Sequence, residues 1–388
     1  MKNSIEYLLI VIALFFMASC NESNNQLQTN LPVFQLDKFE ANLVDYITAS
    51  GKEPVAWAYT ISHNGQLERS FASGKAQTAD DNNINFTLNK EINIASVTKF
   101  YTAIAVMQLL KMNDLDENAI IDDWLPDSWN PGPAINNLSF SDLLKQQSGL
   151  QSVNTDFDNT LSYNGIKNCI ETGVVKLKTY EYLNVNFALF RILIPSLLKG
   201  AIPALNIDIE SDADTQYWYR FYMQEYIFNV TGSSNVTCTP EDRSTATLYY
   251  HVDDPALNRQ GVYYADWNKW CGGGGYFMTA IEMAKVNAYF EHTELLVTKE
   301  QRDIMKANRF GMDREDPSRE INGSYYGKNG SIGNSDDPSE TQGVRTQVVI
   351  FPSTGIDCVV VMNCQGVQLK DGASLRQTIY NAYNDAWE

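Results

Sequence analysis

The sequence predicts an α/β (α+β) fold with strands near both ends of the chain and a mostly helical middle. Near the start, "VAWAYTISHNGQLERSFASGKA" alternates between apolar and polar residues and turns at residues 63–65, which is typical of an antiparallel hairpin. Near the end, "QGVRTQVVIFPSTGIDCVVVMNC" contains two β-rich runs joined by a Pro-Ser-Thr-Gly turn. Between them, "FYTAIAVMQLL" is apolar on nearly every side, so we expect a helix buried within the protein.

Further helices are predicted on either side of these strands. "DKFEANLVDYITAS" has apolar residues at helical spacing, which predicts a helix near Asp37 to Ala49, and "SLRQTIYNAYNDAW" predicts an amphipathic closing helix. Four glycines, residues 272–275, interrupt the pattern before a helix in "TAIEMAKVNAYF". With 388 residues, 44% of them hydrophobic, the chain can bury a large core in one domain or two interleaved lobes.

Residues 1–19 are predicted to be an export signal that is not part of the fold. They hold one lysine, an apolar run too short to span a bilayer as a stable helix, and small residues before Cys20. The end of this segment, Met17 to Cys20, resembles the lipobox of bacterial lipoproteins, which implies cleavage before Cys20 and a lipid anchor on that cysteine. Because Met17 is uncommon at the first lipobox position, ordinary signal cleavage stays an alternative. Residues 20–32 then form a polar tether, and the protein works outside the cytoplasm, in the cell envelope.

Charge and cysteine content restrict the partners. The formal net charge of −18 argues against nucleic acid, whose phosphates require a basic face. Five cysteines follow Cys20, and an odd number cannot all pair. No C-x-x-C spacing is present, so we expect buried free thiols and neither a metal nor a cofactor.

A serine and a lysine stand three residues apart where the buried helix begins, in "INIASVTKFYTAIAVMQLL". A serine at the amino end of a helix lies near unpaired backbone N–H groups and the positive end of the dipole, which favour a developing negative charge. Lys99 shares the helix face of Ser96, and burial lowers the pKa of a lysine so that it can accept the proton of the serine. The spacing alone is weak evidence, since Ser196 and Lys199 repeat it without similar neighbours.

The longer context resembles the serine β-lactamase and penicillin-binding protein superfamily, especially its class C and D-alanyl-D-alanine carboxypeptidase branch. "SVTK", then "WLP", then "LLKQQSGL" follow in the order typical of that branch, in which the last element commonly reads "LLTHTSGL". Gln146 and Gln147 replace the usual histidine and threonine. The Y-x-N motif of the family matches Tyr182-Leu-Asn184, in "YEYLNVNFALF". The resemblance implies that Tyr182 moves a proton between the serine and the leaving group, and that Asn184 binds the substrate amide and holds the lysine.

The third motif of the family, K-T-G on a strand beside the cleft, has two candidates. Lys328-Asn329-Gly330 precedes the two final strands, as the family requires, whereas the triplet at 370–372 follows them and is typical of a plain turn. We therefore select Lys328, Asn329 and Gly330. Asn329 in place of threonine weakens the case for recognition of a carboxylate. The resemblance further implies that the glycine lets backbone approach substrate and that the amides of Ser331 and Ser96 form an oxyanion hole.

The resemblance implies an antiparallel sheet built from both chain ends, flanked by the terminal helices, with a helical lobe inserted between them. The predicted domain covers residues 33–388, with an α/β lobe of residues 33–95 and 272–388 and a helical lobe of residues 96–271. Ser96 is then expected at the junction of the lobes and Lys328 on the opposite wall of the cleft.

Other hydrolase chemistries are disfavoured. A Ser-His-Asp triad needs a placed histidine and a G-x-S-x-G elbow, but the chain has three histidines and no such elbow. It also has no H-E-x-x-H motif or phosphate-binding glycine loop.

We therefore expect a serine hydrolase that forms an acyl-enzyme on a small-molecule or peptidoglycan-derived amide, β-lactam or ester. The sequence does not distinguish a β-lactamase from a D-alanyl peptidase or an esterase. It also does not show whether Lys99 or Tyr182 accepts the proton of the serine. A lipoprotein that keeps the fold and binds a ligand without turnover is the alternative.

Overall fold

The structure is a computed structural model that describes residues 32–151, 161–335, 337 and 340–388. The predicted signal, the predicted lipidation site Cys20 and nearly all of the predicted tether lie outside the described residues. The chain divides into two compact units, residues 1–35 with 387–388, and residues 36–386. In the first unit, Val33 and Glu388 exchange backbone hydrogen bonds and the rings of Phe34 and Trp387 meet edge to face. The sheet, the helices and the candidate site belong to the second unit.

The predicted hairpin and the two predicted C-terminal strands form one sheet. Within the described residues the sheet has eight strands in the order β10-β5-β8-β9-β1-β2-β3, and β7 also pairs with β8. The strands are β1 (Ala56–His63), β2 (Gln66–Gln77), β3 (Ile84–Asn85), β5 (Tyr250–His251), β7 (Tyr326–Gly333), β8 (Gly343–Phe351), β9 (Ile356–Met362) and β10 (Cys364–Gln365). The expected antiparallel pattern holds except at β5, which comes from the middle of the chain and pairs with β10 in parallel. A short strand from that region was not predicted because two residues carry no alternating pattern.

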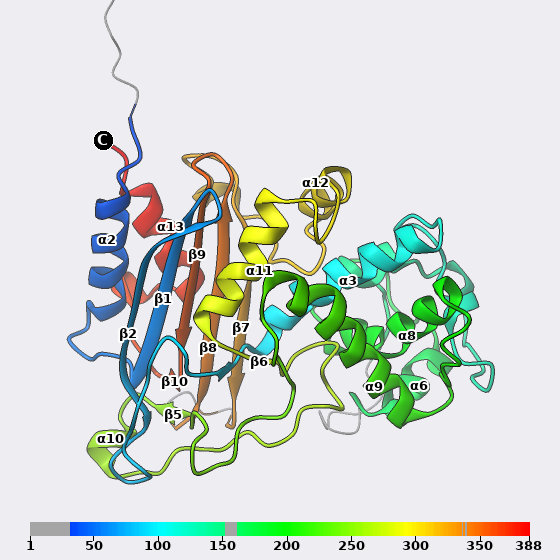
Figure 1. Ribbon diagram of the computed structural model, residues 1–388, viewed down its shortest axis with the longest axis horizontal. Helices are drawn as coiled ribbons and strands as arrows, with labels where there is room; N and C mark the ends of the chain where they lie inside the picture. The colour runs from blue at the N-terminus through cyan, green and yellow to red at the C-terminus, as the bar shows by residue number, and fades with distance from the viewer. Residues whose placement is uncertain (1–31, 152–160, 336, 338–339) are drawn as a thin grey trace, which may run out of the picture. The chain divides into compact units, whose positions relative to one another are not determined.

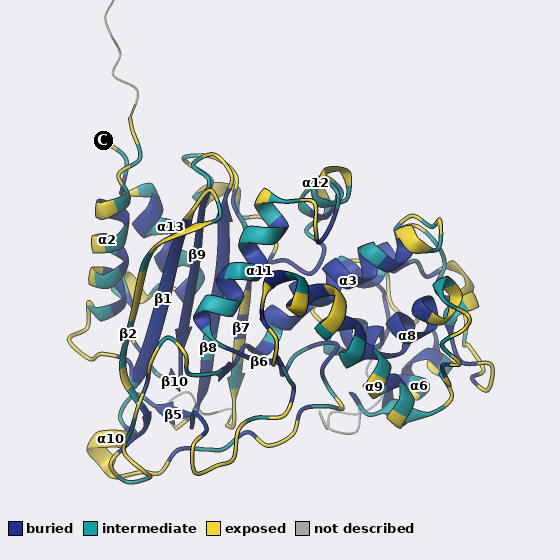
Figure 2. Ribbon diagram, viewed as in Figure 1, coloured by how far each residue is buried: buried dark blue, intermediate teal, exposed yellow. Residues whose placement is uncertain are grey.

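Helices cover both faces of this sheet. α11 (Ala280–His292) packs on β1, β8 and β9 from one face, and α13 (Leu375–Asn384) packs on β8 from the other, beside α2 (Leu36–Thr48), as Figure 1 shows. Successive side chains of a strand point to opposite faces, and all seven residues of β9 are buried (Figure 2). The predicted helices at the two chain ends and after the glycines are therefore confirmed, and the core lies on both sides of the central strands.

The helical part of the chain surrounds α3 (Thr98–Met112). Twelve of its fifteen residues are buried, as the apolar run predicts. Around it lie α8 (Phe190–Ala201), α9 (Asp212–Met223) and smaller helices. The smaller helices of this part are α4 (Phe140–Leu144), α6 (Tyr163–Thr172) and α7 (Asn184–Ala188), whereas α12 (Lys299–Asn308) follows α11 and α10 (Asp254–Leu257) lies near β5, away from α3 (Figure 1). Two short strands, β4 (Ile92–Asn93) and β6 (Phe277–Met278), pair just before α3 and fix where it begins.

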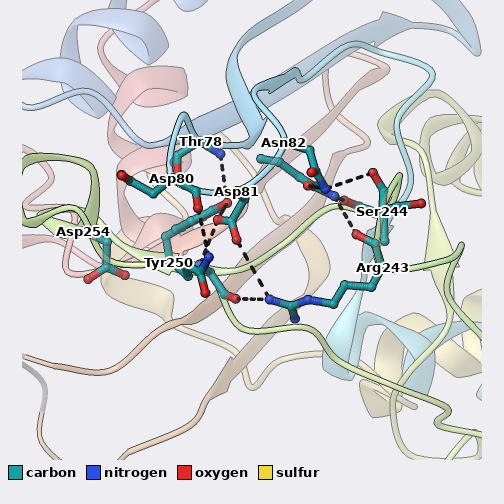
Figure 3. Close-up of polar contacts among 12 residues, drawn as sticks. Thr78, Asp80, Asp81, Asn82, Arg243, Ser244, Tyr250 and Asp254 are labelled. Carbon is teal, nitrogen blue, oxygen red and sulfur yellow. Dashed lines mark hydrogen bonds and ion pairs between the residues drawn. The ribbon is translucent and has the colours of Figure 1, made fainter.

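A polar network attaches the long irregular segment between α9 and α11 to the sheet. The Tyr250 hydroxyl accepts a hydrogen bond from the Thr78 amide at 3.0 Å and donates to Asp81 at 2.8 Å (Figure 3). The same carboxylate accepts from the amide of Gly261 at 3.0 Å and lies 3.9 Å from the Arg243 guanidinium. A segment with little regular structure leaves many backbone groups to satisfy, and these contacts restrain it where it meets the loop after β2.

No helix within the described ranges is long and apolar enough to cross a membrane.

Candidate active site

Ser96 lies in a single helical turn, residues 95–97, that runs directly into α3. Ala95 precedes it with a φ of +49°, a left-handed conformation that costs energy for a residue with a Cβ. The Asn93 carboxamide oxygen supports this turn by accepting from the Ala95 amide at 2.8 Å. The backbone is thus bent so that the serine stands at the amino end of the buried helix, as the sequence predicts.

Lys99 is buried directly behind the serine, with a residue exposure of 1%. Its Nζ lies 3.1 Å from Ser96 Oγ and 2.9 Å from Asn184 Oδ1, and it also donates to the carbonyl of Gly273. Burial lowers the pKa of this amine, because the charged form loses its hydration. Burial thus makes this amine easier to deprotonate than an exposed lysine, and in its neutral form the amine can accept the proton of the serine.

Tyr182 approaches the serine from the solvent side. Its hydroxyl lies 2.7 Å from Ser96 Oγ, and its ring lies 5.0 Å from the Nζ of Lys99 and 5.2 Å from the Nζ of Lys328. Burial by itself raises the pKa of Tyr182, but the charges of the two lysines outweigh burial and lower the pKa to about 8. The residue is still 42% exposed, so the hydroxyl can meet a substrate.

Gln146, where the family pattern has histidine, supports the Tyr182 loop. Its side-chain oxygen accepts from the amide of Leu183 at 3.0 Å and from the Asn186 carboxamide at 2.7 Å. Its backbone oxygen accepts from the amide of Glu181 at 2.9 Å. Gln146 therefore holds the loop that carries Tyr182 and Asn184. The loop is supported even though glutamine replaces the histidine of the family pattern.

Lys328 enters the cleft from β7 and is paired. Its Nζ lies 2.7 Å from Asp313 Oδ1 and 2.9 Å from Asn329 Oδ1, and the other Asp313 oxygen accepts from the Asn329 amide at 2.9 Å. Burial by itself lowers the pKa of Lys328, but the Asp313 carboxylate raises it above the usual value. Asp313 thus holds Lys328 as a cation and raises its pKa, whereas burial lowers the pKa of Lys99. Arg376 of α13 also approaches Asp313, at 3.7 Å.

Gly330 and Ser331 complete the wall opposite the serine. A Cβ on Gly330 would lie 2.4 Å from the Ile94 carbonyl oxygen and 2.3 Å from Thr346 Oγ1. Glycine is therefore needed at position 330 because the strand passes close to the backbone of Ile94, just before Ser96, whether or not a substrate is bound. The Asn329 amide points away from β8, and because hydrogen-bonding directions alternate along a strand, the Ser331 amide points the same way. This orientation is the one that an oxyanion hole with Ser96 requires.

Three successive carbonyls of the glycine-rich loop accept hydrogen bonds from the helical side. The Cys271 carbonyl accepts from Tyr219 at 2.9 Å, the Gly272 carbonyl from Thr102 at 3.0 Å, and the Gly273 carbonyl from Lys99. Four glycines in a row are flexible, so these bonds give the loop a defined position. The loop thereby fixes the lysine.

The expectation that all cysteines are free is wrong for Cys238 and Cys271, which form a disulfide. The two residues are 33 positions apart, and the pairing depends on the fold bringing the irregular segment back to the glycine loop. Cys358 and Cys364 are buried free thiols, and Cys169 is also buried.

Two cavities meet at Ser96. The first, called here the cationic cavity, has a volume of about 410 Å³ and is lined by Tyr182 together with Lys328, Arg314 and Arg376. The second, called here the tryptophan cavity, has a volume of about 470 Å³ and is lined by Trp267, Trp270, Ile332 and the glycines 273–274. Ser96, Asn184 and Ser331 line both. Ser96 therefore lies between a charged space and a mostly apolar space.

Several site residues were not predicted from the sequence. Asp313, Arg314 and Arg376 carry no recognisable spacing, and only the rule that a buried lysine needs a partner indicates that an acid must face Lys328. The Gly273 carbonyl lies in a glycine run whose resemblance to a family element implies a place beside the cleft, but no contact with Lys99 was predicted for it. Over the described residues, no group of three histidine, cysteine or acidic side chains is arranged to hold a metal ion.

Comparison with known proteins agrees with this geometry. The Beta-lactamase family model matches residues 55–380 of the chain. The chain belongs to the beta-lactamase family. Beta-lactamase-like protein 4 of Dictyostelium discoideum is 26% identical over 244 residues, which are 58% of this chain and 40% of that protein. The match thus spans less than half of that relative.

Solved structures share the fold of this beta-lactamase family member at low identity. FmtA from Staphylococcus aureus has a TM-score of 0.65 and 18% identity, with 92% of this chain and 88% of that chain covered. The octameric penicillin-binding protein homologue from Pyrococcus abyssi has a TM-score of 0.65 and 16% identity, and the match covers 90% of this chain and 76% of that chain. A class C beta lactamase from Rhodobacter sphaeroides has a TM-score of 0.61 and 13% identity, and the match covers 90% of this chain and 99% of that chain. The predicted β-lactamase/transpeptidase-like fold is confirmed.

Proposed function

We propose that the protein is a serine hydrolase that transfers the acyl group of an amide, β-lactam or ester to Ser96 and then to water. The observation that carries the proposal is the position of Ser96 Oγ, 3.1 Å from a buried lysine amine and 2.7 Å from a tyrosine hydroxyl of lowered pKa. A serine becomes nucleophilic when a neighbouring group accepts its proton, and both neighbours are suited to that task.

The reaction proceeds in two halves. Ser96 Oγ loses its proton to Lys99 or Tyr182 and attacks the carbonyl carbon, and the amides of Ser96 and Ser331 stabilise the resulting oxyanion. The bond to the leaving group breaks, and the leaving group takes up a proton delivered by Tyr182. Water then attacks the Ser96 ester, which releases a carboxylic acid and restores the serine.

The test is intact-mass spectrometry of the protein from Asn21 onward, incubated with a penicillin or with an activated ester, beside Ser96→Ala. A mass increase or turnover that disappears in Ser96→Ala supports the acyl-enzyme. A long-lived penicillin adduct indicates a penicillin-binding protein, rapid penicillin hydrolysis a β-lactamase, and turnover of the ester alone an esterase. Ser196→Ala is the matched control, because Ser196 is buried within α8 and has the same S-x-x-K spacing. Equal behaviour of Ser96→Ala and the unmodified protein would favour a ligand-binding protein without turnover.

We also propose, from the sequence of the first twenty residues, that the protein is exported and anchored by lipid on Cys20. Cys20→Ala should then be released from membranes of expressing cells, whereas the unmodified protein should remain with them. Equal release of both would contradict the anchor and leave the hydrolase proposal intact.

A further inference from the structure

The two cavities beside Ser96 follow one strand in succession. Lys328 and Asn329 of β7 line the cationic cavity, Ile332 and Gly333 line the tryptophan cavity, and Ser331 lines both. Each residue of a strand advances about 3.3 Å. A substrate whose carbonyl faces Ser331 and Ser96 therefore extends toward the cationic cavity on one side and toward the tryptophan cavity on the other.

The position of Tyr182 decides which part of the substrate enters which cavity. The leaving group must receive a proton as its bond breaks, and Tyr182, the proposed donor, lines the cationic cavity. The leaving group is thereby directed into that cavity. The acyl portion, on the other side of the same carbonyl carbon, is directed into the tryptophan cavity.

The tryptophan cavity is lined mostly by apolar surface, with Ser96, Asn184 and Ser331 at its border with the cationic cavity. The rings of Trp267 and Trp270 meet edge to face, with centroids 4.8 Å apart and an interplanar angle of 74°. Trp267 packs against Gly275, where a Cβ would lie 2.6 Å from the tryptophan Cβ, so glycine is needed for the ring to take this place. Gly273 and Gly274 add wall without side chains and leave the space open.

We propose that the tryptophan cavity binds the acyl group of the substrate and that this group is apolar, either a short alkyl chain or an aromatic ring. The inference rests on the proposed function. A cavity of about 150 Å³ lined by aliphatic and aromatic side chains holds benzene. A volume of about 470 Å³ therefore accepts a group of this kind with room to spare. A charged acyl group would lose its hydration against the two indoles, and none of the residues that line the cavity carries an opposite charge to compensate.

The test is a series of p-nitrophenyl esters that share one leaving group and differ in the acyl group: acetyl, butyryl, hexanoyl and phenylacetyl. For the unmodified protein we expect kcat/KM to be at least about 10-fold higher for butyryl than for acetyl, because two methylenes enter apolar surface. In Trp270→Ala this ratio should fall to about 3-fold or less while the acetyl ester is still hydrolysed. Equal rates for all four esters, or an unchanged ratio in Trp270→Ala, would overturn the assignment and leave the serine mechanism standing.

Two further variants guard against a folding defect. Gly274→Ala places a Cβ 3.5 Å from the Ala95 carbonyl oxygen, an ordinary contact, and should lower kcat/KM for hexanoyl more than for acetyl by narrowing the cavity. Trp218→Ala is the matched control, since Trp218 lies half-buried on α9, and it should leave the ester preference unchanged. A loss of preference in Trp218→Ala would assign the effect to general destabilisation and overturn the proposal.

A second measurement needs no turnover. In the Ser96→Ala background, hexanoate and phenylacetate should quench tryptophan fluorescence, acetate should not, and the additional Trp270→Ala change should remove the quenching. If no ester is hydrolysed but this quenching is observed, the proposed function fails and the apolar subsite stands. If neither hydrolysis nor quenching is observed, both fail.

Discussion

Tyr182 and Tyr250 both place a hydroxyl in a polar network, but the neighbouring charges have opposite signs. Tyr182 lies among Lys99 and Lys328, and its pKa is lowered to about 8 even though burial opposes this. Burial and the hydrogen bond to Asp81 raise the pKa of Tyr250 (Figure 3). The same side chain is therefore prepared to release a proton in one place and to keep it in the other.

The difference shows that the charge of the neighbouring group, more than the hydrogen bond itself, decides whether the pKa of a tyrosine is lowered or raised. A cation stabilises the phenolate, whereas a carboxylate stabilises the neutral hydroxyl that donates to it. Perturbed pKa values of this kind gather at functional sites, although structural networks also produce them. If the charge decides the role, the residues around Tyr182 should affect catalysis and those around Tyr250 should affect stability.

The largest effect is expected for Lys99→Met. Loss of the amine removes a proton acceptor from Ser96 and one of the charges beside Tyr182, so kcat/KM should fall by about 10²- to 10⁴-fold. The measurement is steady-state ester hydrolysis, with circular dichroism to check the fold. Lys199→Met is the matched control in the second S-x-x-K segment, where the lysine is exposed, and should leave the rate unchanged. An active Lys99→Met would remove Lys99 from the mechanism.

Replacing each tyrosine with phenylalanine should show that Tyr182 matters for catalysis and Tyr250 for stability. Tyr182→Phe should lower kcat/KM by about 10²-fold with little change in stability, because its hydroxyl is part of the chemistry. Tyr250→Phe leaves the Asp81 carboxylate and the Thr78 amide each one partner short. It should lower the free energy of unfolding by about 1–3 kcal/mol without changing kcat. Denaturant titration measures the free energy of unfolding, and ester kinetics measure kcat and kcat/KM. A stability loss in Tyr182→Phe with an activity loss in Tyr250→Phe would contradict the assignment of the two roles.

The pH dependence of kcat/KM should report Tyr182. A base acts in its deprotonated form, and the deprotonated fraction of Tyr182 grows as the pH rises through its pKa of about 8. We therefore expect activity to rise with pH to a midpoint near 8, and to fall about 10-fold for each unit below it. In Tyr182→Phe this midpoint should disappear. An unchanged midpoint with lower amplitude would assign the titration to another group, such as Lys99.

A smaller effect is expected from opening the disulfide. Cys271 directly precedes Gly272 and Gly273, whose carbonyls hold Thr102 and Lys99. Reduction should let the glycine loop move and lower kcat by about 3- to 10-fold, because a displaced lysine reaches the serine less often. The comparison is between the unmodified protein and the Cys238→Ser/Cys271→Ser variant, each with and without dithiothreitol. The variant should be slow in both conditions, and a fully reduced protein of undiminished kcat would exclude this role for the disulfide.

Local patterns in the sequence were sufficient to predict much of the fold. The hairpin of β1 and β2, the buried helix α3, the strand pair β8 and β9, and the closing helix all have strong periodicity or a clear turn, and each is found where expected. Such patterns depend on neighbours a few residues apart, which is why they are legible without a structure. The motif order also indicated which serine, lysine and tyrosine to examine, and the structure brings Ser96, Lys99 and Tyr182 together. Their catalytic roles stay a proposal, and the lobe boundaries stay a prediction.

The tertiary structure decided the contacts between distant segments. The Cys238–Cys271 pair, the Asp313 carboxylate that keeps Lys328 charged, and the Gly273 carbonyl beside Lys99 are each set by chain segments that meet only after folding. The same holds for the tryptophan cavity, since no local pattern indicates that Trp267 and Trp270 of the irregular segment, or Ile332 of β7, lie beside Ser96. The sequence by itself determined the candidate site residues and the elements that carry them. Burial and the approach of charges, which exist only in the folded protein, determined which lysine has a lowered pKa, which has a raised pKa and what lies on either side of the serine.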